Sequence, residues 1–235
     1  MDMKNNFKTQ ITLILFFIAT LGFAQDKETR DLRRFTEIKV TEGIELIAKK
    51  GNTNSIELDV DRIDLDRVIT EVRGDRLIVQ LRRNSYSRRN NRRIIKAYLT
   101  YTEEIEEIAA STSAEVIFED MIKGKELTIQ TSTSGSVEVK AEVTYLNISA
   151  STSGRVEITG EAQEVEAKAS TGGTIYAYDV EAEEVYAKAN TGADVRVNAT
   201  DRLRANANTG GTVSYRGRPR ADVRSNTGGQ VRRAR

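Results

Sequence analysis

A short polar turn recurs seven times in the second half of this 235-residue chain: a serine or asparagine, then a threonine, then small residues. The interval between successive copies stays nearly constant, and the copies begin at Ser111, Ser132, Ser151, Ser170, Asn190, Asn208 and Asn226. A regular period of about 19 residues is typical of a solenoid, in which each repeat is one coil stacked on its neighbour. No other feature of the sequence constrains the fold as strongly.

Apolar and polar residues alternate on both sides of each turn. Examples are Leu146-Ile148-Ala150 and Val185-Ala187-Ala189 before the turn, and Val137-Val139 and Val195-Val197 after it. A period of two indicates strands with one buried face and one face in water. Short strands joined by one repeated turn suit an all-β parallel β-helix, and we predict about seven coils over residues 105–235.

Equivalent residues of successive coils lie above one another in such a stack. We therefore predict a structural ladder of threonines at the turns, formed by Thr112, Thr133, Thr152, Thr171, Thr191, Thr209 and Thr227. Hydroxyl and amide side chains beside a turn can bond to its backbone and to the next coil. The glycines supply backbone angles that residues with a Cβ resist.

The N-terminal third of the chain has a different organisation. Residues 1–24 carry a basic start, an apolar run from Ile11 to Phe23, and small residues before a cut at Gln25, which predicts a secretory signal peptide. Residues 25–104 have strand alternation without the regular period of the coils, and Gly74-Asp75 fits a tight hairpin. We expect this segment to form an irregular N-terminal β cap, in one structural unit with the coils of residues 105–235. The mature chain has no apolar run long enough to span a membrane.

Composition limits the chemistry. The chain contains no His, Cys or Trp, which removes serine–histidine and cysteine–histidine nucleophiles, disulfides and the usual transition-metal ligands. The acidic group Glu103, Glu104, Glu106 and Glu107 could collect a loose cation, although a solvated approach to the first coil explains it as well. We predict no catalytic, cofactor or metal site.

An arginine-rich run at residues 82–93 is the strongest candidate for ligand binding. It contains Arg82, Arg83, Arg88, Arg89, Arg92 and Arg93 with no acidic residue. Guanidinium forks suit phosphate, sulfate and carboxylate groups. Export argues against nucleic acid, so an anionic glycan or surface polymer is the expected partner; a solvated loop is the alternative. Arg73-Gly74-Asp75 spells a cell-attachment motif, but it is also what a tight turn requires.

Charge is unevenly distributed along the predicted axis. Residues 102–187 hold 18 acidic and 5 basic side chains, whereas residues 196–235 hold 10 arginines against Asp201 and Asp222. Arginine on a terminal coil would protect its open edge against stray strand pairing. The alternative is a head-to-tail contact between a basic end and an acidic flank; the sequence leaves the oligomeric state open.

Three segments together resemble a known family. They are FTEIKVTEGIELIAKKGNTNSIELDV at residues 35–60, VRGDRLIVQL at residues 72–81, and the coils that end in NTGGQV. They are similar to the head GIN domain, an adhesin family found mostly in exported proteins of Bacteroidota-like bacteria, over about residues 30–235. The resemblance implies a right-handed β-helix and an adhesive role, and it supplies no catalytic residues.

These observations predict an exported, non-enzymatic binding module of the bacterial cell envelope that recognises a glycan or another surface polymer. It would act in the periplasm, on the outer surface or as a secreted protein. Two alternatives remain open. One is an envelope structural or assembly protein that binds another protein, and the other is a carbohydrate-active enzyme on a β-helix scaffold.

Overall fold

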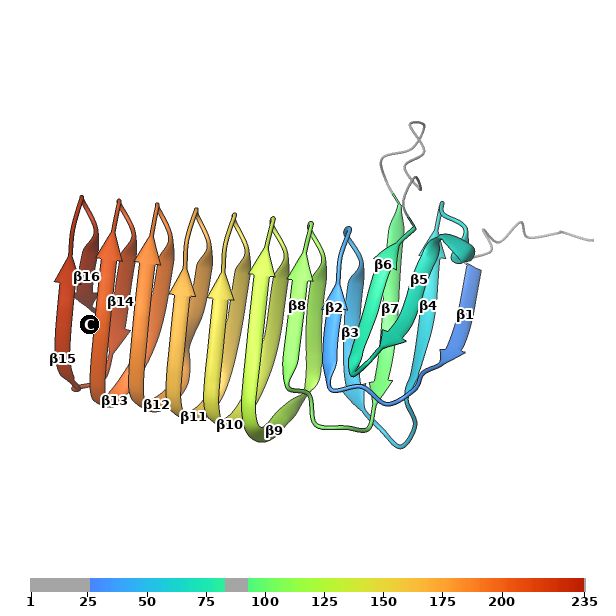
Figure 1. Ribbon diagram of the computed structural model, residues 1–235, viewed down its shortest axis with the longest axis horizontal. Helices are drawn as coiled ribbons and strands as arrows, with labels where there is room; N and C mark the ends of the chain where they lie inside the picture. The colour runs from blue at the N-terminus through green and yellow to red at the C-terminus, as the bar shows by residue number, and fades with distance from the viewer. Residues whose placement is uncertain (1–25, 83–92, 235) are drawn as a thin grey trace, which may run out of the picture.

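The computed structural model describes residues 26–82 and 93–234, and these residues form a long rod of stacked coils (Figure 1). Sixteen strands of the described residues join in one continuous hydrogen-bonded sheet that wraps around the rod. In Figure 1 the coils advance from right to left while the chain rises on the front face and descends on the back face. That sense of turn is right-handed, so the predicted right-handed parallel β-helix is confirmed.

The regular coils contain long strands that each contribute to both faces and, at the two ends, short strands that lie on one face. A long strand descends the back face, bends, and then rises on the front face to the next corner (Figure 1). The strands of this part are β8 (Glu107–Ser111), β9 (Glu115–Ser132), β10 (Ser136–Ala150), β11 (Arg155–Ala169), β12 (Thr174–Asn190), β13 (Asp194–Asn208), β14 (Thr212–Arg216), β15 (Arg220–Ser225) and β16 (Gln230–Arg233).

Parallel pairing places equivalent residues of successive repeats side by side. Val137 of β10 is opposite Val156 of β11, which in turn is opposite Ile175 of β12. The corners are also bonded to one another: the Ser153 N–H donates to the carbonyl of Thr171 at 3.1 Å, and the Gly172 N–H donates to that of Thr191 at 3.1 Å. The repeated turns therefore form a single column along the axis, as the sequence period predicts.

Each corner is a four-residue turn whose two central residues both have positive φ. The central threonines have φ between 47° and 53°, and the residues after them, serine or glycine, have φ between 61° and 75°. The fourth residue donates its N–H to the carbonyl of the first, for example Gly173 to Ser170 at 2.9 Å. Two positive φ values are the signature of a type I′ turn. The threonines thus occupy a backbone region that β-branched residues rarely adopt.

At the fourth position of the corner, Gly173 is small for a different reason. Gly173 has an ordinary negative φ, but a Cβ placed on it would lie 2.3 Å from the carbonyl oxygen of Ala150 in the preceding coil. The sequence-based explanation, in which the glycines supply backbone angles, therefore holds for Gly172, with φ of 72°, and not for Gly173. At Gly173 the coils approach too closely for a side chain.

The interior of the rod is a narrow apolar core. Near the corners it is lined by a column of alanines, Ala150, Ala169, Ala189 and Ala207, each at most 3% exposed. Nearer the bend the inward residues are larger, such as Leu146, Val165 and Leu203. Burial of these alternating residues from both faces is the main apolar stabilisation of the stack.

The N-terminal segment contributes a coil of its own, which the sequence period did not reveal. Strands β2 (Glu37–Val40) and β3 (Glu45–Lys50) flank a corner in which Glu42 and Gly43 have φ of 67° and 72°. The Gly43 N–H donates to the carbonyl of Thr112 at 2.9 Å, so this corner continues the column. Strand β2 pairs in parallel with β8, and β3 pairs in parallel with β9.

The same coil is also covered on its other side by later parts of the chain. Strand β2 pairs in parallel with β6 (Arg76–Leu81), and β3 pairs in parallel with β7 (Ile94–Tyr101). The β2–β3 coil therefore lies between the β6–β7 layer and the β8–β9 coil. Spatial order and chain order therefore differ in this part of the described stack.

Antiparallel strands close the N-terminal end of the rod. Strand β4 (Ser55–Asp61) pairs with β7, and β1 (Asp26–Asp31) pairs with β4. Strand β5 (Val68–Arg73) follows the short 3-10 helix η1 (Leu65–Arg67) and pairs with β6 through the tight turn at Gly74-Asp75, which confirms the predicted hairpin. Hydrogen bonding is continuous across residue 104. The division into a cap and coils stays a prediction, as does the signal peptide, which lies outside the described residues.

The two ends of the described rod differ. At the β15 end all six residues of the strand are exposed, and β15 pairs with β13 on one side. Val223 is 48% exposed although its counterpart in the preceding coil, Ala205, is fully buried. Exposed Arg220, Asp222 and Arg224 lie on the same strand as Val223, and charged side chains of this kind disfavour edge-to-edge pairing.

Candidate functional site

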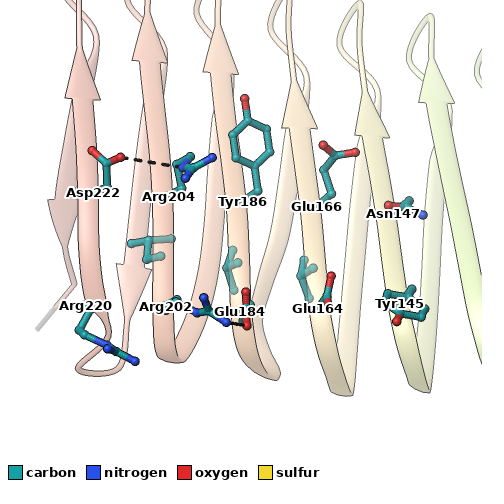
Figure 2. A pocket seen from close by; sticks show the side chains of 13 residues that line it. Tyr145, Asn147, Glu164, Glu166, Glu184, Tyr186, Arg202, Arg204, Arg220 and Asp222 are labelled. Carbon is teal, nitrogen blue, oxygen red and sulfur yellow. Dashed lines mark hydrogen bonds and ion pairs between the residues drawn. The ribbon is translucent and has the colours of Figure 1, made fainter.

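A shallow groove of about 570 Å³ runs along the front face of the rod, across β10 to β15 (Figure 2). Two rows of side chains point outward into it. The row nearer the bend is Tyr145, Glu164, Glu184, Arg202 and Arg220, and the row nearer the corners is Asn147, Glu166, Tyr186, Arg204 and Asp222. Strand pairing aligns the members of each row, so each coil contributes two residues separated by one inward residue.

The strand alternation of the sequence produces this arrangement directly. Between the two rows, Val165, Val185 and Leu203 point inward and are at most 4% exposed, so the strands beneath the groove contribute mainly backbone to its floor. Neighbouring parallel strands lie about 4.8 Å apart. Five coils therefore present pairs of outward side chains at a constant step.

Ion pairs join many of the charged groups in the groove. Arg202 donates to the carboxylate of Glu184, and the Arg204 Nε lies 3.9 Å from the Asp222 Oδ2 (Figure 2). Just outside the groove, Asp201 accepts from Arg220 at 2.9 Å. These side chains are largely exposed, so each pair contributes little to stability and serves chiefly to orient its partners.

Two tyrosines supply the aromatic surface of the groove. Tyr145 is 38% exposed at one end, and Tyr186 is partly exposed in the middle. The Lys168 Nζ lies 5.8 Å from the centroid of the Tyr186 ring and 2.6 Å from the Glu166 Oε1. The ring is thus held beside a lysine–glutamate pair with part of its surface open to solvent.

A second group of aromatic and charged residues lies on the back face and forms no groove. The Tyr176 ring lies between the guanidinium groups of Arg155 and Arg196, at 4.2 and 4.6 Å from its centroid. Hydrogen bonds to Glu157 and Asp194 raise the pKa values of Arg155 and Arg196, respectively. Both faces of the Tyr176 ring are already occupied, so it offers no open aromatic surface.

The acidic residues are not arranged as a metal site. In a groove of about 500 Å³ at the bend, Glu142, Glu161 and Glu181 lie in register, and Lys123 donates to Glu142 at 2.5 Å. Within residues 26–82 and 93–234, no group of three carboxylates is placed to hold a metal ion.

The acidic group predicted near residue 104 is partly engaged by arginine. Arg34 donates to both carboxylate oxygens of Glu103, at 2.6 and 2.8 Å, and holds the pKa of that carboxyl below its usual range. Arg76 donates to Glu107 at 3.2 Å. Glu104 and Glu106 line a separate hollow.

The described ends of the arginine run lie away from the groove. Arg82 follows β6, where its N–H donates to the carbonyl of Arg67 at 2.8 Å, and Arg93 precedes β7. Arg83, Arg88, Arg89 and Arg92 lie outside the described residues. The groove lies on β10 to β15, on the opposite side of the β2–β3 coil from β6 and β7. Whether the run binds a ligand stays a prediction.

The remaining predicted residues lie at turns. The seven threonines of the predicted ladder each lie at an exposed corner, one per coil, and their carbonyls, other than that of Thr112, accept from the neighbouring corner in the stack. The Thr112 carbonyl accepts from the β2–β3 corner. Arg73-Gly74-Asp75 occupies the β5–β6 hairpin, where Arg73 pairs with Glu71 at 2.7 Å and the Asp75 carbonyl accepts from Thr36.

The groove itself was missed by sequence reasoning. Its signal is the pair of outward residues four and six positions before each corner turn, which alternate among tyrosine, glutamate, asparagine and arginine. Aligning the repeats on their corners would have found it. No helix among the described residues is long and apolar enough to cross a membrane.

The fold and the front groove place the chain among the right-handed parallel β-helix proteins. More specifically, the family described as "Putative auto-transporter adhesin, head GIN domain" matches residues 34–219, and the chain belongs to this family. The resemblance found from the sequence is confirmed. No curated protein matches the chain.

Solved structures share this architecture at low sequence identity. A "putative adhesin" from Bacteroides fragilis aligns with a TM-score of 0.77 and 18% identity over 88% of this chain and 95% of that chain. A "putative adhesin" from Parabacteroides merdae aligns with a TM-score of 0.73 and 21% identity, over 89% and 96%. A "Putative lipid binding protein" from Parabacteroides distasonis aligns with a TM-score of 0.69 and 20% identity, over 89% and 96%. At these identities the similarity establishes the fold.

Proposed function

We propose that this protein is an exported, non-enzymatic, adhesin-like binding module of the bacterial cell envelope, and that it recognises a glycan or another surface polymer through the front groove. The observation that carries the proposal is the pair of aligned rows of polar and aromatic side chains along the groove. Family membership supports an adhesive role. The signal peptide predicted over residues 1–24 supports export.

The arrangement suits binding better than catalysis. A glycosidase needs two carboxyl groups that face one bond at a fixed separation, one of them kept protonated by its surroundings. Of the carboxylates that line the described groove, Glu184 is paired with Arg202, Glu166 with Lys168 and Asp222 with Arg204, so Glu164 has no second unpaired carboxylate to act with it. Aromatic rings beside polar groups that fix orientation are the usual composition of a binding surface.

The test uses a glycan array, with groove and back-face variants compared. We expect the wild-type protein to bind, and Tyr145→Ala combined with Tyr186→Ala to reduce affinity at least tenfold, because both open aromatic surfaces are lost. The matched control is Tyr176→Ala, which removes a tyrosine of the back face and should leave affinity within twofold.

Other outcomes would assign a different function. Capture of one envelope protein with no glycan signal would favour the structural alternative, and release of reducing or unsaturated sugars would establish an enzyme. Binding to phosphatidylglycerol vesicles without glycan binding would indicate that this chain binds lipid, as the name of the Parabacteroides distasonis protein says of that protein. Loss of glycan binding in Arg88→Ala with Arg89→Ala, but not in the groove variant, would move the site to the arginine run.

A further inference from the structure

Resting on the proposed function, we infer that the front groove binds an uncharged, hydroxyl-rich chain that lies parallel to the axis of the rod. The inference concerns the ligand class of the same groove. It departs from the anionic ligand that the arginine run suggests. It follows from charge balance, from hydrogen-bonding capacity and from the direction of the two rows.

Nearly every charged side chain that lines the groove has an oppositely charged partner. Four carboxylates and three guanidinium groups line it. Arg202 with Glu184 and Arg204 with Asp222 form ion pairs inside the groove. Arg220 pairs with Asp201 and Glu166 pairs with Lys168 at its margin. Across the described residues, Glu164 is the one charged lining residue without an ion pair.

This balance disfavours charged ligands. An anionic ligand that drew Arg202 away from Glu184 would leave that carboxylate uncompensated beside Glu164. A cationic ligand would find one unpaired carboxylate, Glu164, and would meet the guanidinium groups of Arg202 and Arg204 two coils further along the groove. Separating an exposed pair of this kind costs up to about 1 kcal/mol, or about fivefold in affinity, which a charged ligand would have to offset. A ligand without net charge has neither cost.

Hydroxyl groups match what the ion pairs leave available. A carboxylate has about four acceptor positions and a guanidinium has five N–H donors, so a pair such as Arg202 with Glu184 still offers both donors and acceptors. A hydroxyl both donates and accepts, and it can therefore bond on each side of such a pair. Asn147 adds an amide with the same dual capacity.

The apolar parts of the groove match the carbon face of a sugar ring. The exposed surfaces of Tyr145 and Tyr186 can cover that face and exclude water from it. Aromatic rings with a polar edge suit ligands that are apolar on one face and polar at the rim. The groove is therefore complementary to a chain of such rings.

The orientation follows from the rows. Their five members come from successive coils at steps of about 4.8 Å, so the groove spans about 19 Å along the axis. A ligand that lay across the strands would meet both rows once, whereas one parallel to the axis meets each coil in turn. Because each coil presents a different pair, the chain would bind in one register.

The experiment measures glycan class and salt dependence together. The array carries uncharged oligosaccharides, acidic ones such as oligogalacturonates, and cationic glucosamine oligomers, with the methyl-esterified galacturonates and acetylated glucosamine oligomers as uncharged matched chains. We expect hits among uncharged chains, with affinity that changes less than threefold between about 50 and about 500 mM NaCl, since few ions are displaced.

Variants at Glu164 report on charge and separate this inference from the proposed function. Glu164→Gln should keep binding to uncharged chains within threefold, and Glu164→Lys should create binding to the acidic chains. Hits confined to acidic chains with steep salt dependence would overturn the inference and leave the proposed function standing. If uncharged glycans bind the Tyr186→Ala variant as tightly as the wild type, the ligand lies outside the groove and the inference is also overturned. An array without any hit would overturn both.

Discussion

At the residue scale, the threonines of the corners combine a strained backbone with a repeated position. A β-branched residue at φ near 48° costs about 1–2 kcal/mol relative to its ordinary conformations. The corner tolerates this because the stacked carbonyls and N–H groups fix it on both sides, as at Thr171.

This strain predicts opposite effects for the same substitution at two nearby threonines. Thr171→Gly should raise the free energy of unfolding by up to about 1 kcal/mol, because release of the strain exceeds the entropic cost of glycine. Thr174→Gly, in strand β12 at negative φ, should lower it by about 1 kcal/mol. Urea unfolding midpoints measure both. Destabilisation at both sites would show that the Thr171 side chain stabilises the corner by more than its strain.

The sequence predicts the position of each corner but not its backbone conformation. The period and the alternation predict where each coil turns. Nothing in the residue type predicts that Thr171 adopts positive φ, because threonine's own preference is for the β region. The stack imposes the angle, and a stack is a property of several repeats together.

At the element scale, β7 joins the parallel stack to the antiparallel strands at the N-terminal end. Its last residue, Tyr101, is 2% exposed, and its ring meets Phe118 of β9 edge to face at 5.6 Å. Burial raises the pKa of Tyr101 from 10.0 to about 12. The folded protein therefore holds this proton more tightly than the unfolded chain does.

The raised pKa predicts sensitivity to alkali. Between pH 10 and pH 12 the tyrosine ionises in the unfolded chain before it ionises in the folded protein, so the free energy of unfolding falls by about 1.4 kcal/mol per pH unit. Below pH 10 this contribution is fully present. Tyr101→Phe should flatten the curve over this interval, as measured by urea unfolding at several pH values. An equal slope in the variant would mean that other groups carry the alkaline loss.

The β2–β3 coil shows why element order was harder to predict than element type. Its strands were recognised by alternation, but its corner reads Thr41-Glu42-Gly43 and lacks the repeated motif. Its partners β6 and β7 follow it much later in the sequence. Local patterns carry no information about such non-local pairing, so the segment was assigned to an irregular cap.

At the scale of the whole molecule, the rod is close to a one-dimensional array in which each coil contacts its neighbours. Deletion of residues 152–170 joins Ser151 to Thr171 and removes one coil with both corners in register. We expect a folded protein by circular dichroism, with a smaller urea m-value because less surface is exposed on unfolding. Failure to fold would show that the coils are not interchangeable.

The matched control is the deletion of a coil that lies outside the regular repeat. Deletion of residues 37–50 takes out the β2–β3 coil, whose neighbours on the two sides come from different parts of the chain. We expect loss of cooperative unfolding, because β6–β7 and β8–β9 then have no common partner. A stable product would contradict the proposed importance of this coil.

The groove could not be read from a fixed period. Glu164 is opposite Glu184, and Glu184 is opposite Arg202, but the first of these steps along the chain is longer than the second. Register shifts at the bends, such as the one between Ala177 and Glu184, absorb the difference. An alignment of the repeats on their corners, and not a fixed spacing, shows which outward residues share a row.

The position of the β2–β3 coil has a consequence for how the rod is assembled during synthesis. This coil is bound on one side by β6 and β7 and offers its other side to β8 and β9. We therefore expect the N-terminal part of the chain to act as a template on which the first repeat assembles. Growth would then proceed in one direction, with each later coil packing on the one before it.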